Sequence, residues 1–148
     1  MVPKPRFGRC SAVERFDVVV IGGGWGGYTA ALRARQHGLS AALVERDRLG
    51  GTCLHRGCIP TKVLLQTAET LDLARRMVEF GVQVGAPELD YRAVLARKGR
   101  VVDQLYRGLQ QLVRTSGVEL IAGEGRLLPE RRVAVAASDG SRELQATN

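Results

Sequence analysis

The chain has 148 residues, of which 45% are hydrophobic and 25% charged, a composition typical of a globular domain and not of a disordered chain. The formal net charge is +7, but basic residues are scattered along the chain and aromatic residues make up only 5%, so we expect no nucleic acid partner. The longest uncharged stretch, Val18–Leu32, has 15 residues and contains several glycines, whereas a membrane-spanning helix needs roughly 20 apolar residues.

The first third of the sequence predicts a βαβ unit. Residues 1–15 are polar and basic and lack the apolar core of a secretion signal, so we expect a loose tail on a cytoplasmic protein. The Val-rich segment Phe16–Ile21 predicts a buried parallel strand, and Tyr28–Gln36 predicts a helix that stops at Gly38. Leu39–Glu45 then predicts a second strand, parallel to the first and next to it.

The rest of the sequence predicts two long helices and three further strands. Apolar residues at helical spacing and a following glycine predict helices over Thr61–Phe80 and Tyr91–Ser116. The predicted strands are Val118–Ala122 and a hairpin of Arg132–Ala136 with Arg142–Ala146 around Asp139-Gly140. Together these elements predict a three-layer α/β fold of Rossmann type, with a parallel sheet, flanking helices and a β-hairpin or meander.

A glycine loop joins the first predicted strand to the first predicted helix. Gly22, Gly24 and Gly27 form the pattern G-x-G-x-x-G, which allows a tight turn, close approach of a pyrophosphate and close helix–strand packing. Glu45 ends the second strand, where a carboxylate can accept hydrogen bonds from ribose hydroxyls. The loop therefore predicts a dinucleotide site, although it does not distinguish FAD from NAD and a glycine-rich turn without a ligand is the alternative.

Two cysteines, Cys53 and Cys58, are separated by four residues at the start of the predicted long helix. In a straight helix their positions differ by about 7.5 Å along the axis, whereas a disulfide needs Cα atoms within about 7 Å. We therefore expect a distorted turn if they pair, which Gly57 and Pro60 permit. A disulfide that closes so small a loop adds little stability, so a redox role is favoured over a structural one. Lys62 lies one helical turn after Cys58, where its positive charge favours a thiolate or an anionic flavin. Zinc binding is disfavoured because the chain offers no second ligand pair.

The segment Gly51-Thr52-Cys53-Leu54-His55-Arg56-Gly57-Cys58-Ile59-Pro60-Thr61-Lys62 resembles the redox-active helix of the FAD-dependent pyridine nucleotide disulfide oxidoreductases. Within that family it is most similar to the dihydrolipoamide dehydrogenase branch, and the resemblance extends from about Phe16 to the end of the chain. It implies that residues 16–148 form an FAD-binding domain that carries a redox-active disulfide. In such enzymes electrons pass from a dithiol, the lipoyl group of a 2-oxoacid dehydrogenase complex, through the disulfide and FAD to NAD.

The resemblance also implies roles for individual residues. Cys53 is expected to exchange with the dithiol substrate, and Cys58 is expected to contact the flavin. The implied cofactor contacts are Gly22, Gly24, Gly27, Glu45, Gly51, Thr52, Lys62, Gly125, Ala146 and Thr147. Among these, Thr52 and Lys62 line the flavin, Gly125 approaches the adenine, and Ala146-Thr147 begins the family's Ala-Thr-Gly contact with FAD.

The sequence departs from the family pattern in several ways. Asn148 stands where the family has the glycine after Ala-Thr, and His55 stands where many relatives have Asn. The family's NAD domain, its dimerisation domain and its catalytic His–Glu pair have no counterpart here, so we expect NAD binding and homodimer formation only through a missing part and no turnover by these 148 residues alone. A non-catalytic FAD-binding fragment and a glutathione or mercuric reductase-type relative stay open as alternatives. Cys10 is expected to be an exposed free thiol, and the role of His55 stays open.

Overall fold

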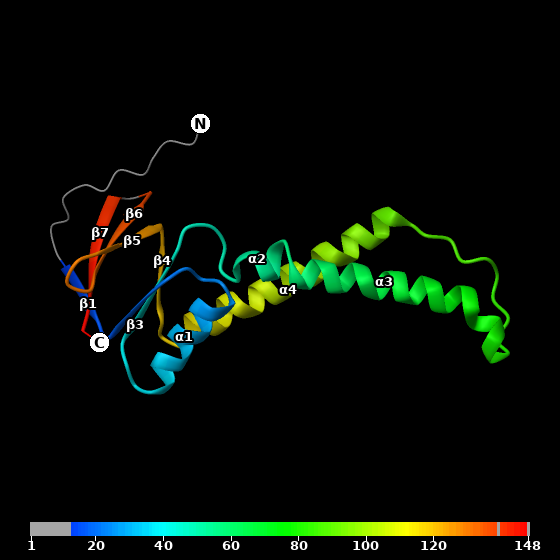
Figure 1. Ribbon diagram of the computed structural model, residues 1–148, viewed down its shortest axis with the longest axis horizontal. Coiled ribbons are helices and arrows are strands. Elements are labelled where there is room, and N and C mark those ends of the chain that lie inside the picture. The colour runs from blue at the N-terminus through cyan, green and yellow to red at the C-terminus, as the bar shows by residue number, and fades with distance from the viewer. Residues whose placement is uncertain (1–12, 139, 148) are drawn as a thin grey trace. The chain divides into compact units, whose positions relative to one another are not determined.

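The computed structural model describes residues 13–138 and 140–147 (Figure 1). The chain divides into two compact units. One, here called the sheet unit, comprises the chain up to Gly51 and from Gly108 onward, and the other, the helical unit, comprises Thr52–Arg107. Among the described residues, no helix is both long enough and apolar enough to span a membrane.

A parallel three-stranded sheet forms the centre of the sheet unit. Its strands are β2 (Val18–Ile21), β3 (Ala41–Glu45) and β4 (Glu119–Ala122), in the order β2-β3-β4. Val18 lies opposite Ala41, so the prediction that the first two strands are parallel neighbours is confirmed. The first four residues of β3 are fully buried, as expected for a central strand covered on both faces.

The strand predicted over Phe16–Ile21 is in fact two strands. Val13–Phe16 forms β1, which belongs to a different sheet, and Asp17 separates it from β2. The Asp17 carboxylate accepts hydrogen bonds from the Ser40 amide and the Ser40 hydroxyl, both at 2.7 Å, and this fixes the chain between the two strands. The predicted tail was therefore wrong for Val13–Arg15, while residues 1–12 lie outside the described part.

The second sheet contains the predicted hairpin and two strands, β1 and β5, that were not predicted from the sequence. Its order is β1-β7-β6-β5, formed by β1, β5 (Glu124–Leu128), β6 (Arg132–Ala137) and β7 (Gly140–Ala146). The antiparallel β6–β7 pair confirms the hairpin, although Asp139 at its turn lies outside the described residues. β5 extends the hairpin to a meander, and β1 adds to the other edge in parallel with β7.

The sheet unit has three layers, as predicted, but the third layer is the meander sheet. Helix α1 (Trp25–Gln36) packs on β2 and β3 through the buried side chains of Ala31 and Ala34. On the other face, side chains of the two sheets form one hydrophobic core with Phe16 and Val19 packed against it, and its buried members are Ala42, Val44, Ile121, Val133, Val135 and Leu144. This core holds β3 and its terminal Glu45 in place.

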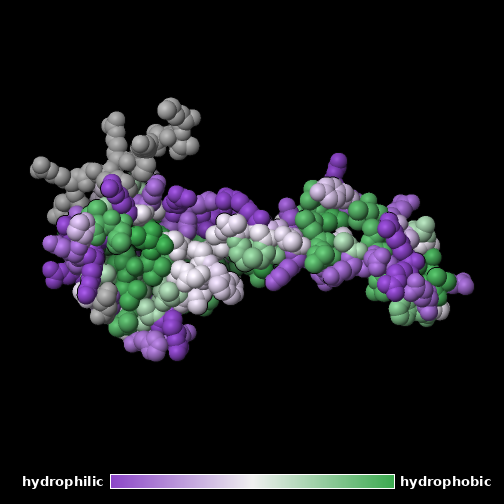
Figure 2. Space-filling model, in the orientation of Figure 1, coloured by the Kyte–Doolittle hydropathy of each residue, from purple (hydrophilic) through white to green (hydrophobic). Residues whose placement is uncertain are grey.

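The helical unit consists of α2 (Gly51–His55, beginning at the unit boundary), α3 (Cys58–Arg76), the 3-10 turn η1 (Met77–Phe80) and the first part of α4 (Tyr91–Thr115). The two long helices predicted from the sequence are confirmed, with α3 starting three residues earlier than expected. Many apolar side chains of this unit stay exposed (Figure 2), including Val78 at 70% and Phe80 at 67%, both in η1. The buried side chains of the helical unit are Leu54, Pro60, Val63 and Val102, so the unit has a small core of its own.

Candidate functional site

The glycine loop makes a tight turn between β2 and α1. Gly22 has a φ of +99°, a conformation that favours glycine, and its amide donates to the Val44 carbonyl at 2.7 Å. A Cβ on Gly27 would lie 1.7 Å from the Gly22 carbonyl oxygen. The close helix–strand approach that the sequence predicted at Gly27 is therefore present, and no other residue type fits there without moving the turn.

The middle glycine of the loop borders open space at the start of α1. A Cβ built on Gly24 would meet no atom of the described residues within 4 Å, and Gly24 has an ordinary extended conformation with φ −70°. Within the described part of the chain, no side chain caps the N-terminus of α1 and no acidic residue lies in its first turn. Free amide groups and the helix dipole favour an anion at such a terminus, so the loop fits a pyrophosphate.

Glu45 ties the end of β3 to the glycine loop. Its Oε2 accepts a hydrogen bond from the Gly23 amide at 2.6 Å, and its Oε1 accepts one from the Asp47 amide at 2.8 Å. A carboxylate oxygen has two acceptor sites, so each oxygen keeps one for a further donor such as a ribose hydroxyl. Glu45 is partly exposed, and it therefore both shapes the loop and stays available to a ligand.

Cys53 and Cys58 form a disulfide, with Cα atoms 4.7 Å apart. The expected proximity is confirmed, but the expectation that both lie on the first turns of the long helix was wrong. Cys53 lies in α2 and Cys58 is the first residue of α3, because the chain leaves the helical conformation at Gly57, with φ −127° and ψ −107°. A Cβ on Gly57 would lie 3.2 Å from the Thr52 carbonyl oxygen, so glycine allows the compact turn that brings the cysteines together.

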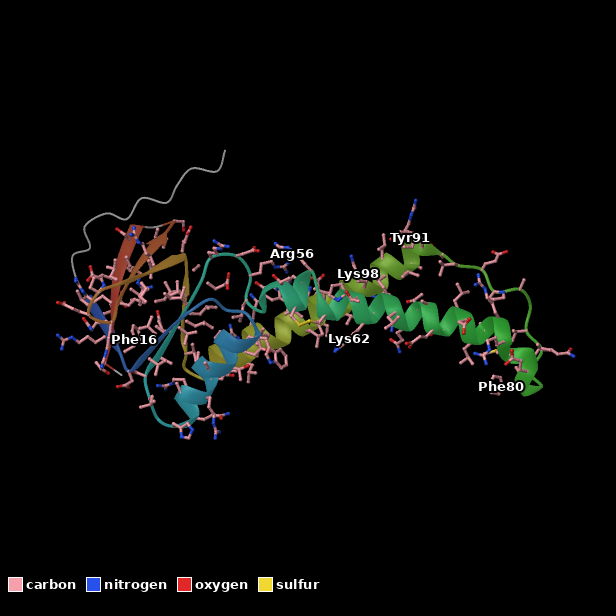
Figure 3. All side chains as sticks on the ribbon, in the orientation of Figure 1. Phe16, Arg56, Lys62, Phe80, Tyr91 and Lys98 are labelled. Atoms are coloured by element: carbon pink, nitrogen blue, oxygen red, sulfur yellow. A yellow bond between two sulfur atoms is a disulfide. The ribbon has the colours of Figure 1, made fainter. Side chains whose placement is uncertain are left out.

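Three predicted cofactor contacts flank the disulfide in sequence. Gly51 has a φ of +59° and packs against the loop, since a Cβ there would lie 3.0 Å from the Gly24 Cα. Thr52 in α2 and Lys62 in α3 are both exposed, and Figure 3 shows Lys62 near the start of α3. Lys62 follows Cys58 by one helical turn, which places the two on one face of α3.

The predicted contacts near the end of the chain all lie in or beside the meander sheet. A Cβ on Gly125 would lie 3.1 Å from the Ile21 side chain and 3.2 Å from Val44, so packing between the two sheets by itself explains a glycine there. Ala146 is the last residue of β7, opposite Phe16. The Thr147 amide donates to the Phe16 carbonyl at 3.0 Å and continues that pairing.

The role of His55 was left open by the sequence, and the structure shows which side chain its ring contacts. Its imidazole meets the phenol ring of Tyr106 edge to face, with centroids 5.0 Å apart and an interplanar angle of 77°. The two residues are far apart in sequence, and no local pattern links them. Cys10, the third cysteine, lies outside the described residues.

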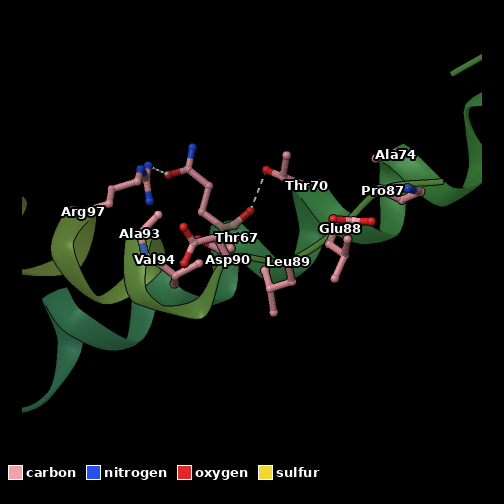
Figure 4. A pocket seen from close by; sticks show the side chains of 12 residues that line it. Thr67, Thr70, Ala74, Pro87, Glu88, Leu89, Asp90, Ala93, Val94 and Arg97 are labelled. Carbon is pink, nitrogen blue, oxygen red and sulfur yellow. Dashed lines mark hydrogen bonds between the residues drawn. The ribbon is translucent and has the colours of Figure 1, made fainter. Parts of the chain in front are cut away.

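A separate cavity of about 440 Å³ lies between α3 and the start of α4 (Figure 4). Gln66 and Arg97 both line it, and Arg97 donates to the side-chain oxygen of Gln66 at 2.6 Å. The cavity is lined by neither cysteine, so it does not belong to the disulfide site. In the described ranges, 13–138 and 140–147, no group of three metal-ligating side chains gathers in one place.

The fold and site together define an α/β domain of the FAD-binding type that carries a disulfide. Residues 16–147 match the model of the pyridine nucleotide-disulphide oxidoreductase family. The chain is 48% identical over 113 residues to the dihydrolipoyl dehydrogenase of Bacillus subtilis (strain 168), covering 76% of this chain and 24% of that protein. It is 44% identical over 139 residues to the dihydrolipoyl dehydrogenase of Chlorobaculum parvum, covering 93% and 30%.

A solved structure shares the fold. It is the Cu(II) complex of the HOCl-induced flavoprotein disulfide reductase RclA from Escherichia coli, with a TM-score of 0.74, 25% identity, and coverage of 90% of this chain and 27% of that one. The chain thus belongs to the pyridine nucleotide-disulphide oxidoreductase family. It spans 24–30% of the length of the two curated relatives named above.

Proposed function

We propose that the chain is the FAD-binding and disulfide portion of a dihydrolipoamide dehydrogenase-like oxidoreductase. The observation that carries this proposal is the Cys53–Cys58 disulfide, held across a turn made by Gly57 in a chain that belongs to a flavin-dependent disulfide reductase family. A bond that closes so short a loop contributes little stability, which supports a redox role.

The sheet unit supplies the groups that suit FAD. The open space at Gly24 and the free N-terminus of α1 suit its pyrophosphate, and Glu45 keeps acceptor sites for its ribose. When bound, FAD supplies a two-electron acceptor for the reduced cysteine pair. The roles of Gly51, Thr52, Lys62, Gly125, Ala146 and Thr147 as further contacts are proposed from the family resemblance.

The disulfide acts by thiol–disulfide exchange. A thiolate of the dithiol attacks one cysteine sulfur, the S–S bond breaks, and the other cysteine leaves as a thiolate. The second substrate thiol then attacks the substrate sulfur of this mixed disulfide and releases the first cysteine as a thiol. The substrate is oxidised to a cyclic disulfide and the protein gains two electrons and two thiols. The family resemblance assigns the attacked sulfur to Cys53 and the flavin contact to Cys58. The names of the relatives support a lipoyl group as substrate. NAD as the final electron acceptor, a homodimer and a cytoplasmic location are further parts of the proposal.

Titration with FAD tests the cofactor assignment, because Trp25 is the single tryptophan of the chain and begins α1 beside the loop. We expect FAD to quench its fluorescence. Gly24→Ser adds a side chain in open space and a favoured N-cap residue, so we expect unchanged or higher thermal stability but FAD affinity lower by about tenfold or more.

The matched control is Gly108→Ser, the same substitution at a helical position that is also open. It should bind FAD like the original chain. Equal FAD affinity for Gly24→Ser and Gly108→Ser, or no quenching by FAD in any protein, would remove the loop as the cofactor site.

A further inference from the structure

Helix α2, which carries Cys53, is too short to hold its own shape. It has five residues, whereas isolated helices shorter than about 12–15 residues are marginal in water. Its link to α3 runs through Arg56 and Gly57, and Gly57 has no side chain to anchor it. In the oxidised protein the disulfide ties α2 to α3 covalently. Reduction removes that tie, so the positions of the two thiols then depend on other contacts.

Non-covalent contacts of α2 near the cysteines include a buried side chain and a ring contact. The Arg56 amide donates to the Thr52 carbonyl at 2.8 Å, which only holds the helix together internally. Leu54 is buried, and the His55 ring meets the Tyr106 ring of α4 edge to face at 5.0 Å. The ring contact is directional and joins the turn between the cysteines to a helix of 25 residues.

We propose that the contact between His55 and Tyr106 is a clamp that keeps the Cys53 and Cys58 thiols close together after the disulfide is reduced. Both are positioning residues, and the inference rests on the proposed function only in requiring that the disulfide opens and closes. The clamp raises the effective concentration of one thiol toward the other. It therefore favours the disulfide over the dithiol, since less freedom is lost when the bond re-forms.

The equilibrium that reports the clamp is exchange with a small dithiol. Reduced dithiothreitol converts the protein disulfide to two thiols and becomes a cyclic disulfide, through a mixed disulfide, so atoms and electrons balance. An aromatic pair of this geometry contributes enough to change an equilibrium constant roughly 2- to 13-fold. Removing either ring should shift the exchange constant toward the reduced protein by up to that factor.

The test equilibrates the 148-residue chain with defined ratios of reduced and oxidised dithiothreitol, traps free thiols and counts them by mass. All proteins carry Cys10→Ser, so that the third cysteine does not contribute. His55→Ala, His55→Asn and Tyr106→Leu remove a ring, and each should favour the reduced form. His55→Phe and Tyr106→Phe keep both rings, and each should stay within about twofold of the parent. The double variant His55→Ala/Tyr106→Leu should shift no further than either single variant.

Two results would overturn the inference. One is an unchanged exchange constant in the ring-removing variants that melt like the parent. The other is a shift in His55→Phe equal to that in His55→Ala, which would assign the effect to the imidazole and not to ring contact. If one ring-removing variant does not fold, the other two decide. The assay needs no flavin, so failure of the FAD titration and failure of the clamp are distinguishable.

Discussion

The three glycines of the loop differ in what limits them, although the sequence presents them as one pattern. Gly22 is constrained by its backbone conformation, Gly27 by a neighbouring carbonyl, and Gly24 by nothing in the described chain. Of the three, only Gly24 can therefore be substituted in a way that affects ligand binding without disturbing the fold, and for this reason it is the position chosen for the cofactor test.

For Gly27→Ala we expect a large loss of stability. The added Cβ would lie 1.7 Å from the Gly22 carbonyl oxygen, so the turn or α1 has to move. Overpacking typically costs about 1–3 kcal/mol and sometimes more, and contact with backbone points to the upper end. Thermal unfolding by circular dichroism measures it, with Gly108→Ala as control at an open helical position. A melting temperature equal to that of the control would contradict the packing at Gly27.

The stability of the sheet unit depends on pH through Asp17, and the direction of this dependence follows from the pKa of its carboxyl. Hydrogen bonds from the Ser40 hydroxyl and amide, and then from Thr147, hold the pKa of this carboxyl below its ordinary value. A lowered pKa in the folded state means that the carboxylate stabilises the fold above its unfolded pKa of about 4. That contribution is lost as the pH falls through the lowered value.

The corresponding prediction is that Asp17→Asn reduces stability at pH 7 and flattens the acid limb of the stability profile. Urea unfolding between pH 7 and pH 2 measures both effects. Asp103→Asn, at an exposed carboxyl in α4, is the matched control for the loss of one negative charge. An acid limb of full steepness in Asp17→Asn would assign the pH dependence to other groups.

At the scale of elements, β1 is a four-residue edge strand fastened by an ion pair. Arg142 on β7 donates two hydrogen bonds to the Glu14 carboxylate, at 2.8 and 2.6 Å. These bonds are the main reason that the pKa of Glu14 lies below its ordinary value, with the charge of Arg142 adding to them and burial opposing. Both side chains are about one-third exposed, so solvent and salt weaken the pair.

We expect Glu14→Gln to cost about 0–1 kcal/mol at neutral pH, the range of exposed ion pairs. The difference from the original chain should shrink in high salt and also at pH values below the lowered pKa, where Glu14 is itself protonated. Chemical denaturation at low and high ionic strength measures it, with Glu88→Gln as control. A cost that does not change with salt would show that Glu14 acts through packing of β1 and not through its charge.

At the scale of the whole molecule, the chain holds one part of the proposed electron path. The resemblance places the NAD domain and the catalytic His–Glu pair in parts of the family to which these 148 residues have no match, and a general base alone is typically worth 10²–10⁴ in rate. We predict that the 148-residue polypeptide with FAD and dihydrolipoamide exchanges its Cys53–Cys58 disulfide but forms no NADH at rates of about 1–10³ s⁻¹.

Absorbance of NADH and thiol trapping on the same sample measure the two halves of this prediction. The trapping is the internal control, because it shows that the dithiol reached the disulfide. NADH formation at enzymatic rates that Cys53→Ser abolishes would show that these residues suffice for the whole reaction.

Much of the local structure and the closeness of the two cysteines could be predicted from the sequence. The Val-rich run, the glycine pattern and the helix-stopping glycines depend on neighbours a few residues away, so β2, α1 and the Gly27 packing followed from local rules. The closeness of Cys53 and Cys58 also followed, because the backbone between them is short and contains Gly57.

Contacts between distant residues needed the tertiary structure. Phe16 pairs with Ala146 across the sheet, and that pairing turned part of a predicted tail into β1. Strand formation depends on the partner strand more than on the strand's own residues, so β1 and β5 had no local indication. The Asp17–Ser40 bonds and the His55–Tyr106 contact likewise join segments that only the fold brings together. The sequence by itself thus determined the tight glycine loop after β2 and the closeness of the two cysteines, because those depend on short-range geometry. Only the tertiary structure decided that β1 pairs with β7, that β5 pairs with β6, and which distant residues contact α2, because such contacts form when distant parts of the chain pack together.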